Sequence, residues 1–201
     1  MDLAVIAIAF GAIFLVELPD KTFIAALVLS TRYPPRAVWV GVGVAFLIQT
    51  LIAVSVGKVV TYLPHGIVQG VAGVIFLAGA FLLFREAPKA DAAEAATEEE
   101  FAAMAGDTKT GWAAVIASFL VLFAAEWGDL SQLLTISLVG KYHEPVSVFI
   151  GAWAALLVVS GLAIVAGRVL LRHVRLSLIH YIGAAVCLLL ALITAAELIW
   201  N

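Results

Sequence analysis

Apolar residues dominate six stretches of the chain, and each is long enough to cross the roughly 30 Å hydrocarbon core of a bilayer as a helix. Turn-forming residues separate several of these stretches. The pattern predicts an all-α integral membrane protein with six transmembrane helices. The six stretches cover residues 3–29, 37–60, 66–84, 112–139, 146–169 and 178–200.

Two of these stretches carry an acidic motif near the middle. The first motif is Glu17-Leu18-Pro19-Asp20-Lys21-Thr22, and the second is Glu126-Trp127-Gly128-Asp129-Leu130-Ser131. Proline and glycine weaken a helix, so Pro19 and Gly128 predict that the first and fourth helices are kinked or broken at the motifs. In the helical spacing, acids three positions apart share one face, which brings Glu17 beside Asp20 and Glu126 beside Asp129.

Charged side chains at this depth of a membrane require compensation. Each isolated charge at mid-membrane costs roughly 2.5 to 3.5 kcal/mol, so the four acids and Lys21 together would cost roughly 12 to 17 kcal/mol. We expect the acids to face a shared wet cavity, to share protons and to bind a cation.

The chain is also an internal duplication. A displacement of 109 residues superposes the two acidic motifs, and one of 110 superposes Gly41 on Gly151 and Gly73 on Gly183. Since each half has an odd number of spans, the second half should enter the membrane from the opposite side, giving two inverted three-helix repeats. We therefore expect a first repeat at 1–84, an acidic cytoplasmic linker at 85–110 and a second repeat at 111–201.

The basic residues predict the orientation. Both termini are expected outside the cytoplasm and the linker inside it, because positive residues favour the cytoplasmic side. A compact chain without targeting additions suits a bacterial inner membrane. One side would hold Arg32, Arg36, Arg85, Lys89, Lys109, Arg168, Arg172 and Arg175, and the other only Lys58 and Lys141.

Composition narrows the function further. The chain is 64% hydrophobic and 12% charged, and its net charge of −3 comes largely from the linker, so a nucleic-acid partner is not expected. The lone Cys187 excludes an internal disulfide and a cysteine-based metal cluster. No cofactor is expected. Four histidines fall near predicted helix ends, where we interpret them as interfacial or loop residues: His65, His143, His173 and His180.

The motifs supply oxygen donors without nearby thiolate or imidazole. Such a set favours hard divalent cations, calcium, manganese or magnesium, over zinc, copper or nickel. Lys21 can compensate one negative charge, and Gln49 and Thr50 either add neutral oxygens or pack helices. The predicted ligands are Glu17, Asp20, Glu126 and Asp129, with Thr22, Ser131 and Gln132 as neutral donors.

Clustered carboxylates bind protons and metal in competition. This competition is the physical basis of antiport, and with an inward proton gradient the expected direction is cation export. The acidic cavity could instead hold a small cationic solute, and competition between metals and amines would separate the two. An intramembrane hydrolase using an aspartate pair and a membrane scaffold are the alternatives from other classes; the sequence favours a transporter and not an enzyme.

The two motifs resemble the Glu-x-Gly-Asp-(Lys/Arg)-(Thr/Ser) signatures of uncharacterised protein family 0016, the cation/proton exchangers that include transmembrane protein 165. The resemblance covers nearly the whole chain. It implies six core helices in inverted repeats, exchange of manganese or calcium for protons, and the four motif acids as ligands. Two positions depart from the family pattern: Pro19 stands where glycine is usual, and Leu130 replaces the usual basic residue.

Overall fold

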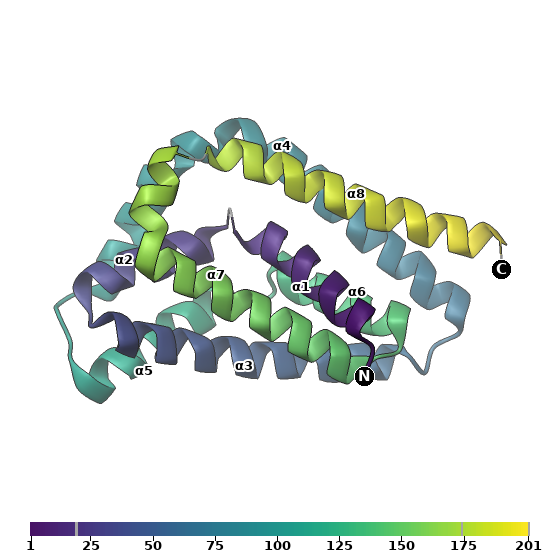
Figure 1. Cartoon of the computed structure of the whole chain (residues 1–201), viewed down its shortest axis with the longest axis horizontal. Helices are drawn as coiled ribbons and strands as arrows, with labels where there is room; N and C mark the ends of the chain where they lie inside the picture. The colour runs from purple at the N-terminus through teal and green to yellow at the C-terminus, as the bar shows by residue number, and fades with distance from the viewer. Residues whose placement is uncertain (19, 174, 201) are drawn as a thin grey trace.

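The described chain is entirely helical. A computed structural model describes residues 1–18, 20–173 and 175–200, which form eight α-helices and no strand (Figure 1). This confirms the predicted all-α class. The helices are α1 (Leu3–Glu17), α2 (Lys21–Arg32), α3 (Pro35–Val60), α4 (His65–Ala105), α5 (Gly111–Ala125), α6 (Leu130–Tyr142), α7 (Pro145–His173) and α8 (Leu176–Trp200).

The first and fourth predicted spans are broken at the acidic motifs, as expected. The chain bends by 70° between α1 and α2, and by 72° between α5 and α6. Gly128 lies in the second break with a φ of +81°, a left-handed conformation that glycine adopts without steric cost. Pro19, the expected cause of the first break, lies outside the described residues. In the described part of the chain, four other helices are apolar and long enough to cross a membrane alone, and counting each bent pair as one span raises the number to six.

Long helices form the frame around the two bent pairs. Helix α4 runs antiparallel along α8, while α3 and α7 pack against each other and against the bent pairs (Figure 1). The first half of each bent pair packs on a long helix from the other half of the chain, α1 on α7 and α5 on α3. Both termini lie at the same end of the molecule (Figure 1).

Equivalent positions in the two halves of the chain make equivalent contacts. Gly41 of α3 lies directly on the backbone carbonyl of Val115 in α5, and Gly151 of α7 lies on the carbonyl of Ile6 in α1. These glycines let the helix backbones touch, as small residues do in membrane helix pairs. Matching aromatic pairs also stack within the bent pairs, Phe10 with Phe14 and Phe119 with Phe123.

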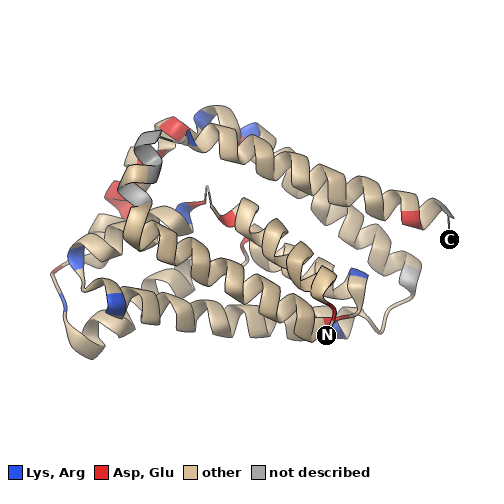
Figure 2. Cartoon of the chain, in the orientation of Figure 1, with Lys and Arg blue, Asp and Glu red and all other residues tan. Residues whose placement is uncertain are grey.

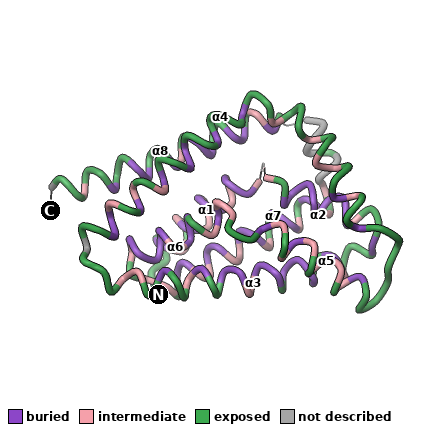
Figure 3. The backbone as a smooth tube through the Cα atoms, turned by 180° about the vertical axis from the view of Figure 1, so that it is seen from behind, coloured by how far each residue is buried: buried purple, intermediate pink, exposed green. Residues whose placement is uncertain are grey.

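The outer surface is apolar. Buried residues face the interior of the bundle, and exposed residues cover much of α4 and α8 (Figure 3). Val74 of α4 is 68% exposed and Leu188 of α8 is 45% exposed. Apolar exposure of this extent is typical of a surface that contacts lipid.

Helix α4 is longer than the third apolar stretch. The segment 85–105, expected as a solvated and partly helical linker, continues α4 without a break despite Pro88 within it. Alanine and glutamate dominate this segment, and both are strong helix formers. Tertiary contacts also hold it: the Ser177 hydroxyl donates to Asp91 at 2.8 Å, and the Tyr33 hydroxyl donates to the Ala105 carbonyl. Charged residues gather in this part of the molecule (Figure 2).

A partly buried ion pair joins α6 to α8 towards the end that carries the termini. The Lys141 ammonium lies 3.2 Å from a Glu197 carboxylate oxygen and donates to the Thr194 hydroxyl at 2.9 Å. The Lys141 side chain is only 2% exposed, whereas that of Glu197 is 40% exposed. Removing either partner would leave the other without its nearest opposite charge.

Candidate functional site

The two helix breaks position the four motif carboxylates. Glu17 is the last residue of α1, and Asp20 caps the start of α2, where its carboxylate accepts from the Lys21 amide at 2.7 Å. In the second motif Glu126 caps the end of α5, and Asp129 caps α6 by accepting from the Ser131 amide at 3.1 Å. The expectation that each acid pair lies on one helix face was therefore wrong, because the helix ends between the two acids.

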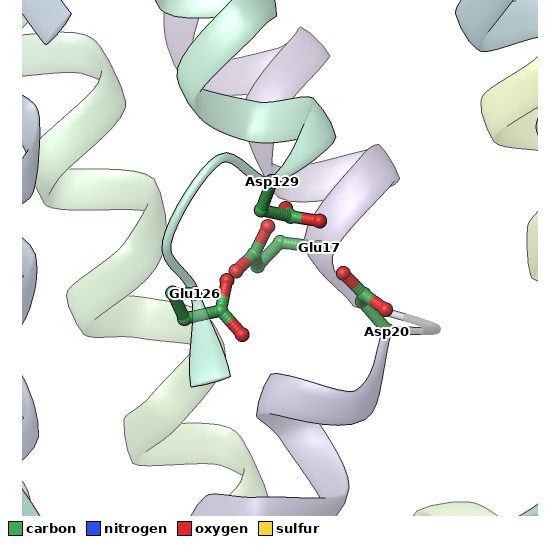
Figure 4. Close-up of side chains that lie close together, drawn as sticks. All are labelled: Glu17, Asp20, Glu126 and Asp129. Carbon is green, nitrogen blue, oxygen red and sulfur yellow. The ribbon is translucent and has the colours of Figure 1, made fainter. Parts of the chain in front are cut away.

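The breaks bring the four carboxylates into one cluster, which we call the carboxylate centre (Figure 4). One oxygen from each of Glu17, Asp20, Glu126 and Asp129 lies within 4.8 Å of the others. Glu17 is 0% exposed and Glu126 is 2% exposed, while the two aspartates are partly exposed. Among the described residues, nothing forms a hydrogen bond with either carboxylate oxygen of Glu17 or with Oε2 of Glu126.

Neutral residues of the motifs brace the centre. The Thr22 hydroxyl donates to Oε1 of Glu126, which links the two bent pairs. The Gln132 amide donates to the Glu126 carbonyl at 2.9 Å, and its oxygen accepts from the Gly128 amide at 3.3 Å. Gln132 therefore bridges the break between α5 and α6. As a ligand, it remains a prediction.

A small cavity lies beside Glu126 on the side of α3. Ser131, Gln132, Gln49 and Thr50 line it together with Glu126. Gln49 and Thr50 are each 3% exposed, and the Gln49 amide donates to the Phe123 carbonyl at 3.0 Å. Gln49 thus contacts α5 one turn before Glu126 and lies next to the centre. This position suits both roles considered for it, helix packing and oxygen donation.

A larger cavity of about 380 Å³ opens from the aspartate side of the centre. Asp20, Lys21 and Asp129 line it, and so do Glu86 of α4 and His180 of α8. No ion pair within 4.0 Å joins Lys21 to a carboxylate among the described residues. Its charge compensation therefore remains a prediction.

Glu86 and His180 were not expected at the site. Glu86 falls in the predicted linker, and His180, interpreted as interfacial, is buried with 8% exposure. If the third span is continued as a helix, Glu86 lies on the same face as Leu82, four positions earlier. Both residues line the cavity, so this spacing is the sequence signal for Glu86. Leu130, which departs from the family pattern, also lines this cavity and packs against Gly79 of α4.

The geometry dictates what the centre can hold. Two unit charges 4.8 Å apart repel by about 3 to 4 kcal/mol at an effective dielectric constant near 20. Four neighbouring carboxylates therefore need a cation or protons to neutralise them. Oxygen ligands from carboxylates and hydroxyls suit hard divalent cations.

Comparison with known proteins agrees with this chemistry. The model of the divalent cation/proton antiporter GDT1 family matches residues 5–91 and 114–199. The GDT1-like protein sll0615 of Synechocystis is 34% identical over 185 residues, covering 85% of this chain and 89% of the relative. Protein PAM71 of Arabidopsis thaliana chloroplasts is 31% identical and covers 96% of this chain, which spans 57% of that relative's length.

The matched segments include both acidic motifs, all of α3 and α7, nearly all of α8, and α4 as far as residue 91. No solved structure matches this chain significantly. The family expected from the two motifs is confirmed, and it is a family of antiporters and not of enzymes. The chain belongs to the GDT1 family of divalent cation/proton antiporters.

Proposed function

We propose that this protein exchanges Mn²⁺ or Ca²⁺ for protons and exports the metal from the cytoplasm. The observation that carries the proposal is the carboxylate centre, in which four acids from two broken helices converge within 4.8 Å. Glu17, Asp20, Glu126 and Asp129 are the proposed ligands. With Lys21 included, the motif residues carry a formal charge of −3 when ionised, so a divalent cation and protons each relieve the same repulsion.

Competition for one set of oxygens couples the two fluxes. A proton arriving on a carboxylate removes a ligand from the metal, and a metal arriving displaces protons. Each unit of pH difference supplies about 1.4 kcal/mol per proton, so an inward proton gradient drives metal outward. Mn²⁺ and Ca²⁺ are favoured because they accept flexible oxygen coordination, whereas Mg²⁺ demands near-ideal octahedral geometry and retains its waters.

We also propose six spans arranged as two inverted three-helix repeats, with both termini outside the cytoplasm and the α4 extension inside. The equivalent helix contacts of Gly41 and Gly151 support the repeats. The excess of basic residues near the extension supports the orientation. The similarity to a cyanobacterial relative over most of both chains supports a bacterial plasma membrane.

Transport in proteoliposomes tests the exchange. With an acidic interior, we expect Mn²⁺ or Ca²⁺ uptake to accelerate several-fold over vesicles without a pH gradient, because outgoing protons drive the metal inward. A metal-sensitive dye and a pH dye inside the vesicles would report both fluxes. A protonophore should remove the acceleration, and Mg²⁺ and organic amines serve as competing cargo. Metal flux that is indifferent to the pH gradient would contradict the proposal.

The hydrogen bond from Thr22 to Glu126 predicts a measurable loss of affinity. Thr22→Val keeps the side-chain shape but removes the donor that holds the Glu126 carboxylate. Hydrogen bonds to charged groups contribute about 1.5 to 3 kcal/mol, so we expect the half-saturating metal concentration to rise about tenfold or more. Thr31→Val is the matched control, because Thr31 donates only to the Val28 carbonyl of its own helix. An unchanged half-saturation in Thr22→Val would show that this bond does not support the site.

A further inference from the structure

Two adjoining cavities lead away from the carboxylate centre, and together we call them the passage. The cavity of about 380 Å³ and a second of about 340 Å³ share Asp20, Lys21, Glu86 and His180. The first reaches Asp129 in the centre. The second continues along the polar extension of α4 to Lys89 and Glu94. The centre is therefore reached from the end of the molecule where α4 carries its charged residues.

Glu86 lies where the two cavities meet. It is exposed, and among the described residues its carboxylate makes no hydrogen bond and no ion pair within 4.0 Å. Another acid of this helix is engaged elsewhere: Asp91 accepts from the amide and hydroxyl of Ser177. Among the described residues, Glu86 is thus an unpaired carboxylate in a passage that reaches Asp20 and Asp129 of the carboxylate centre.

An ion pair bridges two helices at the other end of the bundle. The Lys141–Glu197 ion pair joins α6 to α8 there, and neither residue lines either cavity. Glu197 follows His180 by 17 residues in α8, which corresponds to about 25 Å along the helix. His180 itself is held by its Nδ1, 3.0 Å from the Leu176 carbonyl, which leaves Nε2 as the ring nitrogen available to the passage.

We propose that this passage is the aqueous entrance to the carboxylate centre and that Glu86 is the residue that draws divalent cations into it. The inference rests on the proposed function, because it assigns the face from which the cargo arrives. The side chains that line the passage and carry charge are Asp20, Asp129, Glu86 and Glu94 against Lys21 and Lys89. An acidic excess in a cavity lined partly by apolar residues concentrates cations and raises their rate of arrival. Glu86 acts by positioning cargo and is not one of the four proposed ligands.

Metal uptake from the two faces tests the role of Glu86. In vesicles of defined orientation, Glu86→Gln should raise the half-saturating Mn²⁺ concentration about three- to tenfold from the face that carries the α4 extension. The opposite face should keep the wild-type value. Glu86→Asp retains the charge and should restore most of the apparent affinity. Glu99→Gln is the matched control, because Glu99 is an exposed acid of the same helix that lines neither cavity.

The outcomes separate the two proposals. A half-saturation that is unchanged in Glu86→Gln, or raised equally from both faces, would overturn the entrance role while wild-type transport upheld the antiport. Wild-type protein that moves no metal would instead contradict the proposed function.

Thiol labelling tests the passage itself, independently of transport. Leu133 lines the larger cavity, and the native Cys187 is only 1% exposed, so its thiol is out of reach of an added reagent. Leu133→Cys should react with a membrane-impermeant cationic thiol reagent from the α4-extension face, and Mn²⁺ should slow the reaction. Val74→Cys is the control, because this position is 68% exposed on the lipid-facing surface and should remain unlabelled. Labelling of Leu133→Cys only from the opposite face would overturn the assignment.

Discussion

Glu17→Gln is expected to reduce metal-dependent transport below about 1% of the wild-type rate. Replacing a residue that only contacts a metal ligand already lowers metal affinity or activity about 10- to 100-fold. Glu17 itself offers the carboxylate centre two fully buried oxygens that have no hydrogen-bond partner among the described residues. Glutamine has nearly the same shape but presents one neutral oxygen and no charge. Glu126→Gln should behave alike, because Glu126 is 2% exposed and contributes to the same cluster. Metal-driven proton release in proteoliposomes and calorimetric Mn²⁺ binding in detergent would measure both losses.

Stability distinguishes a lost site from a lost fold in these variants. Removing one of four crowded charges relieves repulsion, so Glu17→Gln should unfold at the same or a higher temperature than the wild type in metal-free detergent. Glu98→Gln, on the polar extension of α4, is the control for the same chemical change and should transport normally. Wild-type rates in Glu17→Gln would refute its role as a ligand.

Gly151→Ala is expected to destabilise the protein strongly. A Cβ atom at this position would lie 2.5 Å from the Ile6 carbonyl oxygen and 2.9 Å from Cβ of Ala9, so helix α1 would have to move. Gly41→Ala meets the equivalent obstacle, with Cβ of Ser118 at 3.0 Å and the Val115 carbonyl closer still. Overpacking costs about 1 to 3 kcal/mol, and backbone atoms yield less readily than side chains. For a chain of this size, that corresponds to a fall of roughly 2 to 12 °C in the unfolding temperature, measurable by thermal denaturation in detergent.

Two other glycines provide matched controls for this prediction. Nothing lies within 4 Å of a Cβ atom built on Gly11 or Gly70. Alanine is the better helix former by about 0.8 to 1 kcal/mol, so these substitutions should leave the unfolding temperature unchanged or raise it. Equal destabilisation at all four positions would show that helix packing does not decide the effect. A displaced α1 would also shift Glu17, so we expect Gly151→Ala to transport poorly even where it remains folded.

The sequence predicted the features that depend on local chemistry. Apolar length identified the helices, and Gly128 correctly indicated that a span breaks at its motif, because glycine weakens a helix and adopts a positive φ without steric cost. The internal duplication of the motif, with its predicted inverted repeats, anticipated that the four carboxylates converge. Helical spacing alone could not show that Asp20 and Asp129 become caps, since the exact end of a helix depends on which backbone amides find side-chain partners.

The features that the sequence did not predict depend on tertiary contacts. The charge run at 85–105 is typical of a solvated segment, yet hydrogen bonds from Tyr33 and Ser177 hold it as a continuation of α4. His180 is buried because α4 packs along α8 for most of their length. Such contacts join residues that are distant in sequence, so no local pattern reports them.

Two acids of the carboxylate centre are also the caps of half-helices. Asp20 and Asp129 each hold the first turn of a half-helix through a backbone amide while the same carboxylate faces the shared centre. A side-chain cap contributes about 0.5 to 2 kcal/mol, so any event that neutralises either aspartate also loosens the beginning of α2 or α6. In the proposed function, the same two carboxylates would therefore bind the cation and cap the half-helices, so loading and unloading of the centre would change how firmly α2 and α6 begin.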